Sequence, residues 1–386
     1  MLATTEAHAL LSHISVLVPE LPEAELLTSW LRRIDTARHY TNFGPLNAEL
    51  TNRLASAVDA LRPSESPAKA VTFANCTSAL IAWLRSIVGC SGGLVLIPGI
   101  TFIATAQAVL SSGNRLAIAD VAPNTWLLTP EMARAAIDDL KARTPGQRLA
   151  AVIPVAAYGT PCDTDAWDRF TEETGIPVLI DAAGAFGNQP LGATTDLAIS
   201  LHATKSLGAG EGGALLSRVP NRAELFIQAS NFGINPHTGL VDHPGENGKL
   251  SEYHAAVGLA ALETWPDQAR RRQQAMRHYT DLLIDHCPAI TLPTRPGDGT
   301  YTLLPVLLPP HADARQTLDH LAEHNIQTRR WYCPPIHHHP LFSQALRISD
   351  LPQCEALSRR LLGLPFHLRM SADDRQRVVT TLARLL

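Results

Sequence analysis

Lysine is rare in this chain, and one lysine stands apart from the others. Only four lysines occur, at positions 69, 141, 205 and 249, among 32 residues of Lys and Arg. Lys69 follows the Pro- and Ser-rich segment 63–68, and Lys141 lies on the polar face of an expected helix, so both side chains are expected to be solvated. Lys205 alone comes just after an apolar run, 197–201, with the pattern of a buried strand. Lys205 is therefore the candidate for covalent lysine chemistry.

A carboxylate also stands at the end of an apolar run. Residues 176–180 are apolar and are followed at once by Asp181. In open α/β sheets, ligands bind at the edge where parallel strands end. A strand-end acid and a strand-end lysine together predict a pyridoxal-phosphate site. Lys205 would hold the aldehyde as a Schiff base, and Asp181 would keep the pyridine nitrogen protonated so that the ring withdraws electrons.

The segment 71–84 predicts a cup for the phosphate of such a cofactor. Residues 71–75 have the pattern of a short strand, and 76–84 that of a helix opening directly after it. The positive end of a helix favours a dianion, and the hydroxyls of Thr77 and Ser78 add donors. Taken alone, these two residues are more typical of an ordinary helix cap. Farther on, Phe102 lies at a strand-to-helix turn where its ring could stack on a pyridine, although a lone phenylalanine is more often a core residue.

Short segments extend this pattern over nearly the whole chain. They are 41–45, 75–80, 101–102, 158–159, 181–187, 200–205, 211–213, 245–252, 255–256, 335–337 and 364–365. In this order they resemble the sugar aminotransferases of the DegT/DnrJ/EryC1/StrS family, which are fold-type I pyridoxal-phosphate enzymes. Each segment alone is a weak signal, but eleven in the family's order are strong.

The resemblance implies a role for individual residues. Lys205 would form the Schiff base, Asp181 would contact the pyridine nitrogen, and Phe102 would stack on the ring. The expected phosphate ligands are Thr77, Ser78 and Ser200.

Other residues are implied to act at the subunit boundary or toward the substrate. Asn247 matches an asparagine that reaches the phosphate from the neighbouring subunit, so a homodimer with shared active sites is expected. His337 is expected on the substrate side, and Arg329 lies in the same segment, 329–339, where it could meet a substrate phosphate or be solvated.

The chain departs from the family pattern at three positions. After Asp-Ala-Ala the family usually has His or Gln, which hydrogen-bonds the cofactor's phenolic oxygen, but here Gly184 offers no side-chain donor. Cys76 stands where the cup usually has Gly, and Ser206 where Asn usually follows the lysine. These departures affect the expected substrate more than the expected cofactor.

Two other motifs are weaker. Residues 208–213 fit G-x-G-x-x-G, but the apolar run after them is typical of a strand rather than a helix, and no acidic residue follows at the spacing that a ribose needs. Residues 337–339 are three consecutive histidines, but consecutive side chains diverge and no Cys or carboxylate is spaced with them as a zinc set. We therefore predict neither a dinucleotide site nor a metal site.

Composition indicates a cytoplasmic enzyme. The net charge of -4 gives no basic field for nucleic acid. No apolar stretch of membrane-spanning length occurs, and residues 1–15 lack the features of a signal peptide. The six cysteines form no C-x-x-C pair and are expected to be reduced thiols.

Alternating periodicity predicts the fold. Apolar runs at 71–74, 94–97, 116–121, 151–155, 177–180, 197–201 and 213–216 alternate with helical patterns, which is typical of a mostly parallel sheet with helices on both faces. A long helix is expected over 267–286, and the pattern beyond it is that of a smaller α+β domain. The expected parts are an N-terminal arm and helix (1–40), a large cofactor-binding domain (41–265) and a small C-terminal domain (266–386).

These expectations together describe a pyridoxal-phosphate aminotransferase. It would move an amino group from an amino acid, such as glutamate, to a keto-sugar carried on a nucleotide. Two alternatives stay open. One is another reaction on the same scaffold, either dehydration or amination of a non-sugar ketone. The other is a non-catalytic regulatory protein with this fold. Related dehydratases replace the lysine, so the presence of Lys205 favours transamination.

Overall fold

The computed structural model describes residues 12–144 and 146–386, in which helices and strands alternate along the chain. The helices are α1 (Ala24–Ala37), α2 (Pro45–Leu61), α3 (Cys76–Trp83), α4 (Ile103–Ser111), α5 (Pro130–Arg143), α6 (Thr164–Thr174), α7 (Arg222–Ser230), α8 (Glu252–His286), α9 (Ala314–Glu323), α10 (Pro352–Arg360) and α11 (Ala372–Ala383). The strands are β1 (Lys69–Phe73), β2 (Leu94–Pro98), β3 (Arg115–Ala119), β4 (Leu149–Val152), β5 (Leu179–Asp181), β6 (Asp196–Ser200), β7 (Gly213–Ser217), β8 (Leu304–Leu307), β9 (Leu346–Arg347) and β10 (Leu361–Leu364). Short helical turns are η1 (Leu84–Val88), η2 (Ala157–Gly159), η3 (Ile336–His338) and η4 (Pro340–Phe342). Each of the seven predicted apolar runs overlaps one of the strands β1 to β7.

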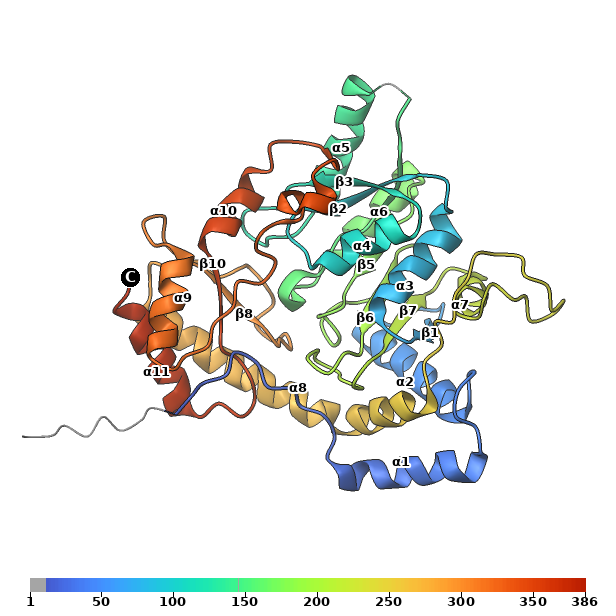
Figure 1. Ribbon diagram of the computed structural model, residues 1–386, viewed down its shortest axis with the longest axis horizontal. Helices are drawn as coiled ribbons and strands as arrows, with labels where there is room; N and C mark the ends of the chain where they lie inside the picture. Colours follow the sequence, from blue (N-terminus) through green and yellow to red (C-terminus); the bar gives the residue numbers. More distant parts are fainter. Residues whose placement is uncertain (1–11, 145) are drawn as a thin grey trace, which may run out of the picture.

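The first seven strands form one large sheet near the middle of the molecule (Figure 1). Strands β1, β7, β6 and β5 lie in that order, and β4, β2, β3 and β9 continue the sheet. The two halves meet through parallel bridges from Val152 to Val178 and from Val155 to Asp181. Strand β7 runs antiparallel to both of its neighbours, β1 and β6, and the other strand pairs described in this sheet are parallel. The predicted mostly parallel sheet is confirmed.

Burial along the strands shows that both faces of this sheet are covered. All five residues of β2, β6 and β7 are buried. Because successive side chains of a strand point to opposite faces, full burial requires packing on both sides. This accounts for the continuous apolar runs in the sequence.

Helix α8 differs from the helix expected over 267–286. It begins at Glu252 and runs through Pro266 to His286 without a break. Figure 1 shows it passing from α1 and α2 at one end toward α9 and α11 at the other. Trp265 packs edge-on against Phe186, with ring centroids 4.9 Å apart, which holds the helix at the proline. The predicted helix start was therefore wrong, because tertiary packing outweighs the missing N–H of Pro266.

The buried apolar residues form two clusters. The larger lies around the large sheet and includes Ile336 and Leu357 from the C-terminal part of the chain. The smaller gathers α8, α9, α11, β8 and β10, and it takes in Ile14 near the N-terminus, whose N–H donates to the Asn325 carbonyl at 2.9 Å. The expected arm thus contacts the smaller cluster before α1 begins, while residues 1–11 lie outside the described part. The proposed domain limits, 1–40, 41–265 and 266–386, stay a prediction.

No helix within residues 12–144 and 146–386 is long and apolar enough to cross a membrane. All six cysteines are free.

Candidate active site

Strand register brings the predicted phosphate ligands to one edge of the sheet. Gly213, the first residue of β7, pairs with Phe73, the last of β1, and with Ser200, the last of β6. Asp181, the last residue of β5, pairs with Ala198. The cup after β1, Ser200 and Asp181 therefore emerge at the same edge, which is where parallel sheets place ligands.

The cup after β1 is the N-terminus of α3. Asn75 caps this helix, because its Oδ1 accepts from the Ser78 N–H at 2.8 Å. The alternative that Thr77 or Ser78 is the cap is thereby wrong. Within the described residues, neither hydroxyl makes a hydrogen bond, so both are free to donate to a phosphate. Gly213 packs tightly against the cup, since a Cβ there would lie 2.5 Å from the Cys76 nitrogen.

Asp181 is buried, with 5% of its surface exposed. Its Oδ2 accepts from Thr105 Oγ1 at 2.8 Å, and its Oδ1 accepts from the Ala183 N–H at 3.1 Å. Thr105 in turn shares a 2.9 Å hydrogen bond with Thr101, so the start of α4 holds the carboxylate in place. Burial raises the pKa of Asp181, and the two hydrogen bonds and the nearby Lys205 ammonium offset only part of that rise.

Lys205 lies in a turn after β6, close to Asp181. Its backbone N–H donates to the His202 carbonyl at 2.9 Å, and its side chain is half-buried. The ammonium group acts electrostatically on Asp181 and on Cys76. Burial and the Asp181 charge raise the pKa of the Cys76 thiol well above its usual range, so this thiol is not a nucleophile. The structure thus brings together Lys205, Asp181 and the first residue of the cup helix.

Phe102 and Gly184 lie near this edge in ways that suit a bound ring. Phe102 directly precedes α4 and is 59% exposed, so the core alternative for this residue is wrong. A Cβ on Gly184 would meet only the Gly159 nitrogen, at 3.9 Å, so a Cβ at this position is unhindered.

Asn247 and Arg329 are not joined to Lys205 by any contact among the described residues. Asn247 is exposed, and its Oδ1 accepts from Lys249 Nζ at 2.7 Å. The next residue, Gly248, accepts from the N–H of Ala74, just before the cup. Arg329 is exposed and pairs through its backbone with Gly363.

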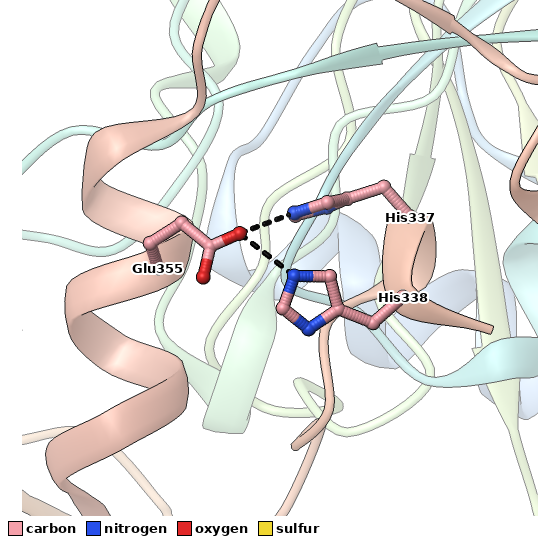
Figure 2. A group of neighbouring side chains, drawn as sticks. All are labelled: His337, His338 and Glu355. Atoms are coloured by element: carbon pink, nitrogen blue, oxygen red, sulfur yellow. Dashed lines mark hydrogen bonds and ion pairs between the residues drawn. The ribbon is translucent and has the colours of Figure 1, made fainter.

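The histidine tract differs from the expectation that its side chains diverge. His337 and His338 both point toward Glu355 of α10 (Figure 2). Their Nε2 atoms lie 2.9 Å and 2.8 Å from the same oxygen, Oε1. Burial lowers the pKa of His337, although the bond to Glu355 offsets part of this effect. We expected no carboxylate spaced with these histidines as a zinc set, and Glu355 is one that is distant in sequence and near in space.

Two residues with a part in this site were missed in the sequence. Thr105 holds Asp181 from the first turn of α4 and accompanies Thr101, which precedes the helix, and no sequence pattern singled it out. Asn75 caps the cup helix and was visible as a good cap residue directly before the helical pattern.

The fold and this site define a fold-type I enzyme, and comparison with known proteins gives its family. The model of the DegT/DnrJ/EryC1/StrS aminotransferase family matches residues 24–383, so the chain belongs to that family. Protein Rv3402c of Mycobacterium tuberculosis is 32% identical over 94% of this chain and 87% of its own. The dTDP-4-amino-4,6-dideoxy-D-glucose transaminase of Shigella dysenteriae is 29% identical over 96% and 99%. The crystal structure of DesI with its TDP-sugar product superposes with a TM-score of 0.83 at 28% identity, covering 96% of this chain and 92% of the other.

The protein is therefore an aminotransferase whose cofactor is pyridoxal phosphate, and the residues present fit that cofactor. The free hydroxyls of Thr77 and Ser78 and the N-terminus of α3 suit its phosphate. The buried carboxylate of Asp181, with its raised pKa, lacks a full counter-charge that a protonated pyridine would supply.

Proposed function

We propose that this enzyme transfers an amino group from an amino acid, with glutamate the expected donor, to the ketone of a nucleotide-linked sugar, and that it works in the cytoplasm. The observation that carries the proposal is that Lys205 lies near enough to the buried Asp181 to act on it electrostatically, at one sheet edge in a chain of this family. The sugar substrate is supported by the Shigella transaminase and by DesI, whose names specify dTDP- and TDP-sugars.

Lys205 is the proposed covalent anchor and proton carrier. When bound, the cofactor supplies an aldehyde for this amine and a ring that withdraws electrons from the reacting carbon. As a free amine, Lys205 would take the proton from the donor's Cα and deliver it on the cofactor side. The same group would then act in the reverse direction when nitrogen passes to the sugar.

The other proposed residues orient and polarise the cofactor. Asp181 would hold a proton on the pyridine nitrogen, with Thr105 and Ala183 fixing its two oxygens. Phe102 would cover one face of the ring. The proposed phosphate ligands are Thr77, Ser78 and Ser200. Arg329, which is exposed, is proposed to contact the substrate, whereas His337, the other residue expected there, is buried and its Nε2 faces Glu355.

The retained lysine favours transamination over the alternatives. A dehydratase of this family would have another residue at position 205, and a non-catalytic relative would have no need of a buried acid beside that lysine. The direct test is to prepare the aminated enzyme with glutamate, add nucleotide-linked keto-sugars one at a time, and follow the return of the cofactor spectrum. We expect at least one nucleotide-linked keto-sugar to restore the original cofactor spectrum. Simple keto acids that are not the keto form of an amino donor should not restore it. Restoration by non-sugar ketones alone would contradict the sugar assignment.

A homodimer with shared active sites is also part of this proposal. Asn247 is exposed and lies in the loop between α7 and α8, where exposed Leu240 and Val241 leave apolar surface for a second copy. In a dimer with crossed sites, Asn247 would contact the cofactor phosphate of the other subunit.

Complementation tests the crossed arrangement. A heterodimer of Lys205→Ala with Asn247→Asp carries both lesions in one pocket and none in the other, so it should recover about half of the activity per dimer. Its two parent homodimers serve as inactive controls. If Asn247 acts within its own subunit, where Gly248 already contacts Ala74, each pocket keeps one lesion and the mixture stays inactive.

A further inference from the structure

Three side chains from two separate segments converge at the histidine tract. One ligand atom from each of His337, His338 and Glu355 lies within 4.8 Å of the other two. Figure 2 shows the two imidazoles reaching from η3 and the carboxylate reaching from α10 to a common point. Two imidazole nitrogens and one carboxylate form a donor set that Zn²⁺ and similar ions bind.

The spacing of these atoms is close to that of a metal site. Zinc bonds of about 2.0–2.1 Å at tetrahedral angles place ligand atoms about 3.3 Å apart. The two Nε2 atoms now lie 2.9 Å and 2.8 Å from Oε1, as hydrogen bonds do. If one cation replaced the two imidazole protons, each Nε2–Oε1 distance would lengthen by about half an ångström. Small side-chain rotations can provide this change.

The elements that bear these ligands are anchored to the large sheet. The N–H of Ile336 donates to the Gly99 carbonyl just after β2, at 2.9 Å. Asp120, just after β3, accepts from the N–H groups of Gln353 and Cys354 at the start of α10. Both supports fix the backbone before any ion binds, so little ordering is required of the protein.

The surroundings set the expected strength and coordination of the site. His337 is buried, whereas the side chains of His338 and Glu355 are 40% and 32% exposed. The exposed side leaves a coordination position for water or for an anionic oxygen of a ligand. The Nδ1 atom of His337 is buried without a hydrogen-bond partner among the described residues. The hydrogen bond that usually orients a metal-binding histidine through its other ring nitrogen is therefore missing. Micromolar rather than nanomolar affinity is therefore expected.

We propose that His337, His338 and Glu355 bind one divalent ion of the Zn²⁺ class and thereby join η3 to α10. This proposal depends on the geometry of the three side chains and not on the proposed sugar substrate. Its test measures binding, so its failure is distinguishable from failure of the transamination proposal.

The experiment is a titration of chelator-treated holoenzyme with Zn²⁺ against a chromophoric competitor. The wild-type protein should bind one equivalent, and His338→Ala and Glu355→Gln should each bind at least ~10–100-fold more weakly. His339→Ala is the matched control, because His339 belongs to the same tract but packs against Phe342 instead of Glu355. It should bind as the wild type does.

Thermal melting gives a second readout. The same Zn²⁺ concentration should raise the melting temperature of the wild-type and His339→Ala proteins more than that of His338→Ala, whose weaker binding gives less stabilisation. His338 is largely exposed, so its replacement is expected to leave the metal-free melting temperature unaltered. Absence of stoichiometric binding by the wild-type protein, or equal binding by His338→Ala, would overturn the proposal.

Discussion

Replacing Asp181 by asparagine removes the negative charge of the side chain and keeps its size and shape. In the Asp181→Asn variant the amide oxygen can still accept from the Ala183 N–H, and the new NH₂ group can donate to Thr105 Oγ1. Packing is preserved because the two side chains have nearly the same volume. The variant therefore removes the negative charge and leaves the network that positions it.

The expected loss of rate follows from the burial of this carboxylate. A hydrogen bond to a charged group contributes about 1.5–3 kcal/mol, and the 5% exposure of Asp181 favours the upper end because little water screens the pair. A loss of about 3 kcal/mol in transition-state stabilisation lowers the rate at least ~100-fold. The assay is the stopped-flow absorbance change when the holoenzyme reacts with excess glutamate.

The same change should have the opposite effect on the stability of the cofactor-free protein. Burial raises the pKa of Asp181, so the folded protein binds this proton more tightly than the unfolded chain does. The resulting contribution to the free energy of unfolding is fully present below the pKa of the unfolded chain. It is lost as the pH rises through the pKa of the folded protein. At about pH 8 the ionised, buried acid is therefore destabilising, and the cofactor-free Asp181→Asn protein should have the higher urea midpoint. The difference should shrink as the pH falls.

Asp120→Asn is the matched control for both measurements. Asp120 is also a buried acid just after a strand, but it caps α10 instead of facing Lys205. Its replacement should lower stability by about 0.5–2 kcal/mol and leave the glutamate half-reaction largely intact. Near-normal turnover of Asp181→Asn, or an equal rate loss in both variants, would refute the role given to Asp181.

The remaining predictions concern the phosphate cup and the missing ring contact. Thr77→Val and Ser78→Ala should each weaken cofactor binding by ~10–100-fold in equilibrium dialysis, because each removes a donor to a dianion, whereas Asn75→Ala should mainly lower helix stability. Unchanged affinity in both hydroxyl variants would place the phosphate elsewhere. Gly184→Gln should shift the spectroscopic pKa of the lysine–cofactor linkage if no other group bonds the phenolic oxygen, and a Cβ at this position meets no close atom. An identical spectral titration with cofactor still bound would show that another residue already fills that role.

The strand ends could be predicted because a strand that is buried on both faces has a continuous apolar sequence. The apolar runs 177–180 and 197–201 overlap β5 and β6, whose polar last residues, Asp181 and Ser200, lie at the edge where the cup also emerges. The role of Gly213 could not be predicted in this way. Gly213 pairs with both Phe73 and Ser200, and this pairing depends on the antiparallel direction of β7.

Contacts between distant segments were beyond the sequence patterns. His337 and Glu355 are 18 residues apart and belong to different elements, so no periodicity relates them. Pro266 was a misleading signal, because local propensity predicts a break where packing of Trp265 on Phe186 maintains the helix. In both cases tertiary structure, rather than local sequence, determines the outcome.

We propose that Lys205 carries the cofactor. Because the chain has only four lysines, peptide mapping can identify which of them is labelled. Holoenzyme is reduced with borohydride, digested, and mapped by mass spectrometry for peptides that bear a pyridoxyl phosphate group. We expect a label on the peptide that contains Lys205, and no label in Lys205→Ala protein treated in parallel. A label on Lys69, Lys141 or Lys249 instead, or none after loading with pyridoxal phosphate, would contradict it.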